Sequence, residues 1–114
     1  MKILVIFTGG TIGSKLTDGF ISPDRGAPYA LLEKFKYPGI GFDTVSPYTI
    51  LSENLSVKEL NILLDTVRKS LHMGYDGIII THGTDTLQYS AAAVLECVKN
   101  TAVPIVFVSS NYPL

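Results

Sequence analysis

Three short apolar runs, each followed at once by a turn of glycine or hydroxyl residues, constrain the fold of this 114-residue chain most. Residues 3–7 are ILVIF, residues 77–80 are GIII and residues 104–108 are PIVFV. Such continuous, partly β-branched runs are typical of strands buried on both faces of a parallel sheet. A fourth segment, residues 42–48, alternates less regularly and contains Pro47, which favours the edge of a sheet.

Helical patterns separate these strands. The segment Ser56-Val57-Lys58-Glu59 has the form of a capping box, and Gly74 is well placed to end the helix that follows it. A second helix is predicted to begin at Thr84 or Asp85, and a shorter one near Pro28. The residues predicted to face inward from these helices are Leu31, Leu32, Phe35, Leu60, Leu63, Leu64, Val67, Leu71, Leu87, Ala91, Val94, Leu95 and Val98.

The alternation of strands and helices predicts an α/β fold, a three-layer αβα arrangement with a mainly parallel sheet. The length fits a single domain over residues 1–114. Only 17% of the residues are charged, against about 25% in average soluble domains. Because the mean hydropathy is also high, at +0.32, we expect apolar surfaces that pack on further protein or on a partner subunit.

Composition excludes several classes of function. Nine basic and ten acidic residues give a net charge of −1, which argues against nucleic acid as a partner. No apolar run approaches the roughly 18–20 residues of a membrane span, and no signal-peptide pattern is present. The single cysteine, Cys97, is predicted to be an inert core thiol, which fits a cytoplasmic protein. The two histidines, His72 and His82, do not form a metal motif.

The glycine turn after the first run matches neither common nucleotide motif. Residues 8–14 lack the Lys-Ser or Lys-Thr of a phosphate-binding loop. Gly9 and Gly10 are adjacent and Gly13 comes next, which departs from the Gly-x-Gly-x-x-Gly dinucleotide fingerprint. The sequence therefore predicts no nucleotide cofactor.

Polar residues follow each predicted strand, where the ligands of parallel sheets bind. A threonine hydroxyl can attack an amide carbonyl when a base removes its proton and backbone amides stabilise the oxyanion, and Thr11 lies among glycines. Amides beside Thr84 at a helix start favour a carboxylate, and Asp85 suits an ammonium group. A small ligand with an ammonium, a carboxylate and an amide is asparagine or glutamine.

A plainer interpretation stays open for each of these residues. Thr8 and Thr11 can be turn residues that satisfy backbone groups, and Asp85 can be a helix cap. Ser52 and Glu53 can be ordinary polar loop residues. His82 is interpreted as structural, hydrogen-bonded under its loop.

At these residues the sequence resembles the bacterial-type L-asparaginase family. Its two signatures are present as Thr8-Gly9-Gly10-Thr11-Ile12 and as His82-Gly83-Thr84-Asp85-Thr86, each after a predicted strand. The likeness covers the whole chain but only about the first third of the family's usual length. It implies a truncated Rossmann- or flavodoxin-like N-terminal domain, without the family's C-terminal domain.

The resemblance also implies roles for single residues. Thr11 corresponds to the nucleophile that forms an acyl-enzyme, and Thr84 and Asp85 to the second threonine and its aspartate. Asp85 also corresponds to the group that binds the substrate's ammonium. Ser52 and Glu53 correspond to the pair that holds its carboxylate and amino groups. With Gly10 and Gly83 as oxyanion-stabilising backbone, the implied reaction converts L-asparagine, or alternatively L-glutamine, and water to the acid and ammonia without a cofactor.

Two departures from the family pattern lower the expected activity. The family's tyrosine near the nucleophile is replaced by Phe20, for which Tyr29 is a poor substitute, and its relay lysine would lie beyond Leu114. We therefore expect the isolated chain to be inactive or very weak. A non-catalytic amino-acid-binding module and a component of a tRNA-dependent amidotransferase stay open as alternatives. The family's members form homo-dimers or homo-tetramers.

Overall fold

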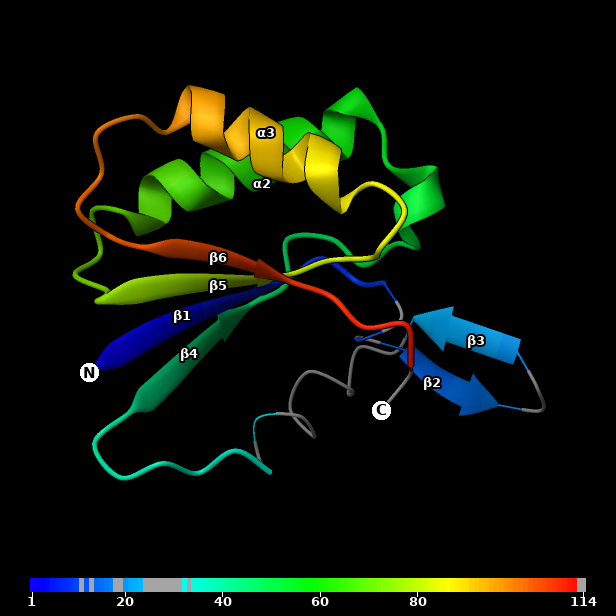
Figure 1. Cartoon of the computed structure of the whole chain (residues 1–114), viewed down its shortest axis with the longest axis horizontal. Coiled ribbons are helices and arrows are strands. Elements are labelled where there is room, and N and C mark those ends of the chain that lie inside the picture. The colour runs from blue at the N-terminus through cyan, green and yellow to red at the C-terminus, as the bar shows by residue number, and fades with distance from the viewer. Residues whose placement is uncertain (11, 13, 18–19, 24–31, 33, 113–114) are drawn as a thin grey trace.

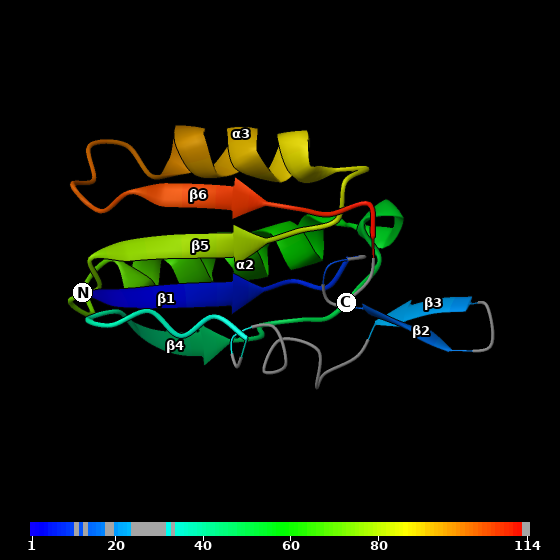
Figure 2. The same ribbon diagram turned by 60° about the horizontal axis from the view of Figure 1, so that its bottom comes forward.

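The computed structural model describes residues 1–10, 12, 14–17, 20–23, 32 and 34–112. Its centre is a sheet of four parallel strands in the order β4-β1-β5-β6 (Figure 2). These strands are β1 (Lys2–Phe7), β4 (Gly41–Val45), β5 (Gly77–Thr81) and β6 (Ile105–Val108). The predicted α/β class with a parallel sheet is confirmed, and the segment with Pro47 is an edge strand that ends two residues before the proline.

Two helices, α2 (Val57–Ser70) and α3 (Leu87–Cys97), lie on the same face of the sheet (Figures 1 and 2). Alternate residues of the central strands point toward them, because successive side chains of a strand face opposite sides. The resulting core contains Leu4, Ile6, Leu63, Leu64, Val67, Tyr75, Ile78, Ile80 and Val94. The helix predicted near Pro28 falls outside the described residues.

The capping box predicted at the start of α2 is confirmed. The Ser56 hydroxyl oxygen accepts the Lys58 N–H at 3.2 Å, and the Ser56 N–H donates to the Glu59 carboxylate at 3.2 Å. The Ser56 hydroxyl also donates to that carboxylate, which holds the pKa of Glu59 below its usual value. The helix ends at Ser70, and the turn after it reaches Gly74 with a positive φ of 77°.

Several predictions for α3 are wrong. The helix begins at Leu87 rather than at Thr84 or Asp85, because Thr86 is its N-cap and has a non-helical backbone conformation, with φ of −127° and ψ of 11°. Leu95 is 71% exposed. Cys97 is exposed as well and is not a core thiol. Both residues flank the strip around Val94 that packs on the core.

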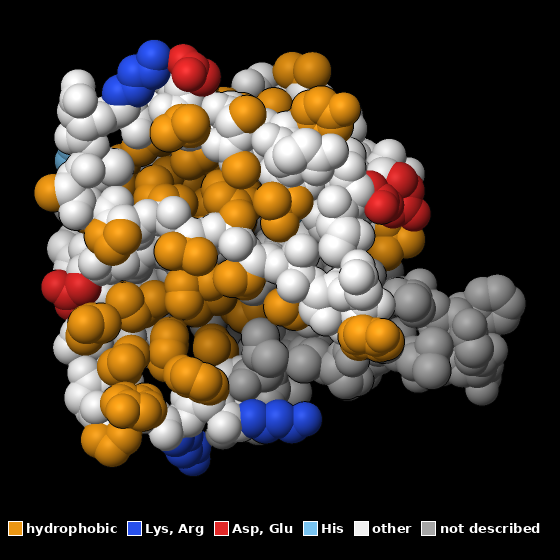
Figure 3. All heavy atoms as spheres, viewed as in Figure 1, with side chains coloured by type: hydrophobic (Ala, Val, Ile, Leu, Met, Phe, Trp, Pro, Cys, Tyr) orange, Lys and Arg blue, Asp and Glu red, His pale blue; other side chains and the backbone are white. Residues whose placement is uncertain are grey.

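The outer strand β6 leaves part of the apolar surface uncovered. Val106 is 51% exposed, so the expectation of burial on both faces is wrong for this strand. Figure 3 shows apolar side chains gathered over α3 and β6 on one face of the molecule. Among the described residues no strand pairs with the outer edge of β6. This surface agrees with the high apolar content of the chain.

A short antiparallel hairpin, which the sequence did not predict, projects beyond the carboxyl end of the sheet (Figures 1 and 2). It consists of β2 (Ser14–Thr17) and β3 (Phe20–Pro23), with Thr17 opposite Phe20. Phe35 was expected to face inward, yet it is 60% exposed and contacts the edge of the Phe42 ring at a centroid distance of 6.2 Å.

Candidate functional site

Three loops meet at the carboxyl end of the sheet, held by backbone hydrogen bonds. The loop after β1 bonds to the segment after β4 in both directions: Ile50 N–H donates to the Thr8 carbonyl at 3.1 Å, and Gly10 N–H donates to the Ile50 carbonyl at 2.9 Å. The same loop reaches β5, since the Thr8 N–H donates to the Thr81 carbonyl at 3.3 Å. The loop after β1, the segment after β4 and the end of β5 thus lie together at this edge of the sheet.

Glycines allow these loops to touch through their backbones. Gly9 and Gly10 have φ values of 102° and 75°, which disfavour other residues. A Cβ on Gly10 would lie 2.5 Å from the Gly83 Cα, and one on Gly83 would lie 2.4 Å from the Ser52 Oγ. A Cβ on Gly9 would lie 2.2 Å from the Ile50 carbonyl oxygen. Residue types with side chains at these three positions are incompatible with the observed spacing.

The short helix η2 (Ser52–Asn54) lies in the segment after β4 and is hydrogen-bonded to the loop before α3. Ser52 is buried, and its Oγ accepts the Asp85 N–H at 3.2 Å. The Ser52 carbonyl accepts the Thr86 hydroxyl at 2.9 Å. These bonds hold the loop before α3 against η2.

The exposed side chains around this junction are those expected to meet a ligand. Glu53, Thr84 and Asp85 are all exposed. Asp85 does not cap the helix: α3 begins two residues later, and the Asp85 carbonyl accepts the Gln88 side-chain amide at 3.2 Å. The junction therefore presents two carboxylates and a hydroxyl to solvent beside a buried serine.

The first signature is only partly described. Thr11 and Tyr29 lie outside the described residues, so the predicted nucleophile is not placed. Thr8 fits its plainer interpretation, since its buried hydroxyl donates to the Thr81 carbonyl at 2.8 Å. The Gly10 N–H is used by Ile50, whereas the buried Gly83 N–H has no acceptor in the part of the chain that the structure describes.

His82 is a buried structural residue, as interpreted from the sequence. Its ring lies under the loop, with Nδ1 2.9 Å from the Gly83 carbonyl oxygen and Nε2 2.8 Å from the Ser90 hydroxyl. Burial lowers the pKa of His82, against a smaller opposing effect of the Gly83 carbonyl. The ring is therefore neutral near pH 7.

Some residues that build the site gave no local signal in the sequence. Ile50 acts through its backbone alone, and Ser90 lies eight residues after His82, so neither could be recognised from a motif. Thr86 belongs to the second signature and could have been proposed as a contact to another loop. Tyr48, in the segment after β4, packs against the core.

We expect Tyr48→Phe to stabilise the fold. The buried Tyr48 hydroxyl makes no well-formed hydrogen bond among the described residues, and burial raises its pKa to about 12 against a weaker opposing interaction with Thr8. Removing an unsatisfied buried hydroxyl should raise the free energy of unfolding by about 1 kcal/mol, measured by urea unfolding.

Tyr75→Phe is the matched control, with the opposite expected sign. The Tyr75 hydroxyl donates to the Asp43 carboxylate at 2.9 Å, and that carboxylate also pairs with Lys2 at 3.0 Å. Loss of a hydrogen bond to a charged group should lower the free energy of unfolding, the opposite direction to Tyr48→Phe. Equal effects of the two substitutions would contradict the assignment of the Tyr48 hydroxyl as unsatisfied.

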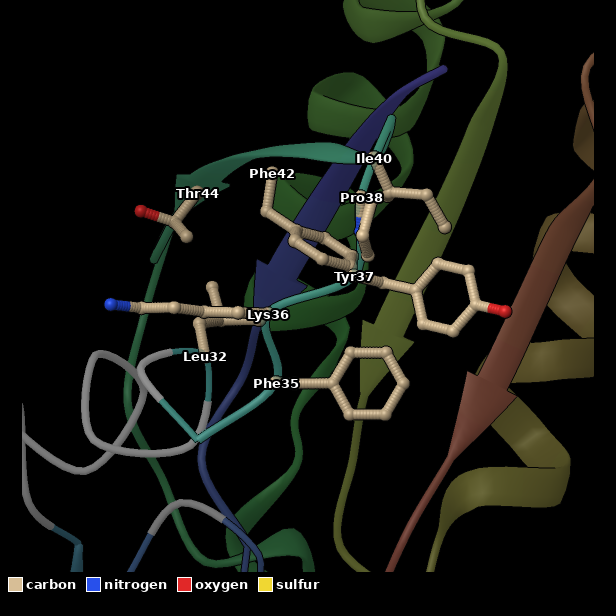
Figure 4. Close-up of a pocket in the computed structure, with 8 residues that line it drawn as sticks. All are labelled: Leu32, Phe35, Lys36, Tyr37, Pro38, Ile40, Phe42 and Thr44. Atoms are coloured by element: carbon tan, nitrogen blue, oxygen red, sulfur yellow. The ribbon is translucent and has the colours of Figure 1, made fainter.

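An open surface groove lies away from these loops, beside β4 (Figure 4). It has a volume of about 680 Å³ and contains none of the predicted site residues. Its lining is mainly apolar and aromatic: Leu32, Phe35, Lys36, Tyr37, Pro38, Ile40, Phe42 and Thr44. The candidate site is thus distinguished by its chemistry and not by the size of a hollow.

No group of three or more histidine, cysteine, aspartate or glutamate residues within the described ranges could hold a metal ion. None of the described helices is long and apolar enough to cross a bilayer.

Comparisons with known proteins find one matching family and relatives that carry two different names. Residues 2–114 match the protein family described as "Asparaginase, N-terminal". The chain is 40% identical over 117 residues to a glutamyl-tRNA(Gln) amidotransferase subunit from Methanosarcina acetivorans, covering 96% of this chain and 26% of that protein. It is 32% identical over 118 residues to L-asparaginase 1 of Escherichia coli K12, covering 99% of this chain and 35% of that enzyme.

A solved structure shows the same fold. The thermostable L-asparaginase from Thermococcus kodakarensis superposes with a TM-score of 0.85 at 31% identity, over 99% of this chain and 35% of that one. The chain therefore spans about a quarter to a third of the length of the proteins it matches.

Proposed function

We propose, because this chain belongs to the asparaginase family, that its strand-end loops bind a small amidated amino acid for hydrolysis of the side-chain amide. The observation that carries the proposal is the backbone contact between the loops of the two signature motifs, Gly10 against Gly83. The proposal takes Thr11, which lies outside the described residues, to act on a ligand held by the loop of Thr84 and Asp85. Amide hydrolysis is the coarse function that this family shares.

The finer mechanism assigns one role to each residue. The Thr11 hydroxyl attacks the side-chain carbonyl of L-asparagine, ammonia leaves, and water then releases L-aspartate from the acyl-enzyme. Asp85 binds the substrate's ammonium group, and Ser52 and Glu53 hold its carboxylate and amino groups. The Ser52 Oγ accepts the Asp85 N–H, so its own proton is available to a ligand carboxylate.

Backbone amides are proposed to stabilise the oxyanion. The Gly83 N–H is the stronger candidate, because no acceptor for it is found in the described part of the chain. The Gly10 N–H already donates to Ile50 and would have to share that proton. No cofactor is needed for this chemistry.

Several aspects of the proposal come from the sequence alone. Residues 1–114 are proposed to form one domain of the asparaginase N-terminal type, in a cytoplasmic homo-dimer or homo-tetramer. Because the implied relay lysine is not among these residues, a polypeptide of this sequence should hydrolyse L-asparagine below the ordinary range of about 1–10³ per second. One methylene changes binding by only about 1–3 kcal/mol, so L-glutamine is an alternative substrate.

The test combines calorimetry with an ammonia assay. L-Aspartate and L-asparagine are titrated into the chain, into Asp85→Asn and into Asp65→Asn, a matched control whose exposed carboxylate lies on α2. We expect Asp85→Asn to weaken binding by about 10- to 100-fold, as the loss of a charge-assisted hydrogen bond to the ammonium requires. Asp65→Asn should bind as the unchanged chain does.

The outcomes separate the proposal from its alternatives. Any ammonia released should disappear in Thr11→Ala. Binding with no detectable release would favour a non-catalytic amino-acid-binding module, and absence of binding would reject the site. Turnover within the ordinary enzyme range would contradict the expected need for the lysine.

The similarity to a glutamyl-tRNA(Gln) amidotransferase component favours a second candidate function. In that case ammonia would be passed to a partner protein and not released as a final product. The two functions are distinguished by measuring whether free ammonia accumulates without any partner protein.

A further inference from the structure

His82 holds a position that the proposed reaction does not use. It directly follows β5. Its backbone N–H donates to the carbonyl of Val108, the last residue of β6, at 2.9 Å. Its side chain is only 2% exposed, and its ring lies 6.1 Å from the Phe107 ring. A buried imidazole that is hydrogen-bonded at both ring nitrogens can fix the conformation of the loop that carries it.

The two partners of the ring determine its tautomer. The Gly83 carbonyl oxygen, 2.9 Å from Nδ1, can only accept a hydrogen bond, so Nδ1 carries the proton. The neutral ring then has a bare Nε2, and the fully buried Ser90 hydroxyl donates to it at 2.8 Å. Through these two hydrogen bonds the ring links the Gly83 carbonyl to Ser90 of α3.

The fixed carbonyl has a consequence for the next amide. In a trans peptide the C=O and the following N–H point in opposite directions. A Gly83 carbonyl directed toward the buried ring therefore directs the Thr84 N–H away from it, toward the exposed side of the loop. That N–H has no acceptor among the residues the structure describes.

We propose that His82 is a positioning residue: its Nδ1–H tautomer holds the Gly83–Thr84 peptide so that the Thr84 N–H faces the ligand beside Asp85. This role rests on the proposed amino-acid site, but the orientation of the peptide and the tautomer can be measured without a ligand. Ser90 supports the arrangement by donating to Nε2.

The first experiment is nitrogen-15 NMR of the imidazole rings at pH 7. Exposed His72 is the only other histidine, and His72→Gln assigns the two sets of signals. We expect the neutral Nδ1–H tautomer for His82. An Nε2–H tautomer or a doubly protonated ring at this pH would overturn the proposal, whether or not the chain binds any amino acid.

Two substitutions then separate the hydrogen bonds of the ring. In His82→Asn the side-chain amide nitrogen can take the place of Nδ1, whereas in His82→Gln the amide reaches toward Ser90 instead. We expect His82→Asn to keep the Thr84 amide resonance near its place and to bind L-aspartate within about threefold of the unchanged chain. His82→Gln should shift that resonance and weaken binding about tenfold.

Failure of this idea and failure of the proposed function give different results. If no variant binds L-aspartate, the ring tautomer and the Thr84 resonance still decide the role of His82. Equal Thr84 shifts in His82→Asn and His82→Gln would overturn it even where binding is normal. If either variant does not fold, the tautomer of the unchanged chain decides alone.

Discussion

Alanine in place of Gly9 is expected to destabilise the chain by about 3 kcal/mol or more, a large fraction of the stability of a small domain. Two costs add. The φ of 102° is unfavourable for any residue with a Cβ, by roughly 1–2 kcal/mol. The new Cβ would also lie 2.2 Å from the Ile50 carbonyl oxygen and 2.6 Å from its nitrogen. Both atoms belong to the backbone, so relief requires the two loops to separate.

Gly39→Ala is the matched control for this prediction. Gly39 has a similar positive φ of 82°, but a Cβ there would meet no atom within 4 Å. The loss in the free energy of unfolding should be limited to the cost of the positive φ, about 1–2 kcal/mol. Urea unfolding of the three proteins measures the difference. Equal losses for Gly9→Ala and Gly39→Ala would show that the backbones of the two loops are not in contact.

Acid should destabilise the chain through His82, starting below pH 6.5. Burial places the pKa of the folded His82 below the ordinary value of 6.5. Below pH 6.5 the unfolded chain therefore binds a proton that the folded chain does not, and the free energy of unfolding falls with pH. The loss approaches about 1.4 kcal/mol per pH unit until the folded pKa is reached. Above pH 6.5 this contribution is constant.

The comparison protein for this pH series is His82→Asn. Its stability should be flat between pH 6.5 and 5 relative to the unchanged chain, because it lacks the buried imidazole. The window stops at pH 5, since carboxylates such as Asp43 and Glu59, whose pKa values are lowered by their partners, contribute below it. Parallel curves for the unchanged chain and His82→Asn would contradict the prediction.

The elements predicted best were those specified by local pattern. The run 3–7 and the capping box at Ser56 depend on neighbouring residues, so spacing and side-chain type were sufficient to identify them. Convergence of the strand-end loops followed from a general property of parallel sheets. That rule, however, does not give the contacts between the loops.

The errors arose where a distant segment holds a loop or where the sheet leaves a surface uncovered. The start of α3 was misplaced because Thr86 has a non-helical backbone conformation, in a loop hydrogen-bonded to the distant Ser52. Leu95 and Cys97 belong to an apolar helical pattern, but α3 lies over the edge strand β6, where the sheet is too narrow to cover both flanks of the helix. Periodicity predicts which side of a helix is apolar and not how far the sheet extends beneath it.

The central position of β1 in the sheet affects how the chain folds during its synthesis. Ile3 pairs with Phe42 on one side and with Gly77 on the other, so this strand has no neighbour until much later residues are synthesised. During translation its apolar run would leave the ribosome well before β5 exists, and early chains should be prone to aggregate or to bind chaperones. Slowing synthesis after β1 should therefore lower the yield of soluble protein, whereas slowing it after β5 should not.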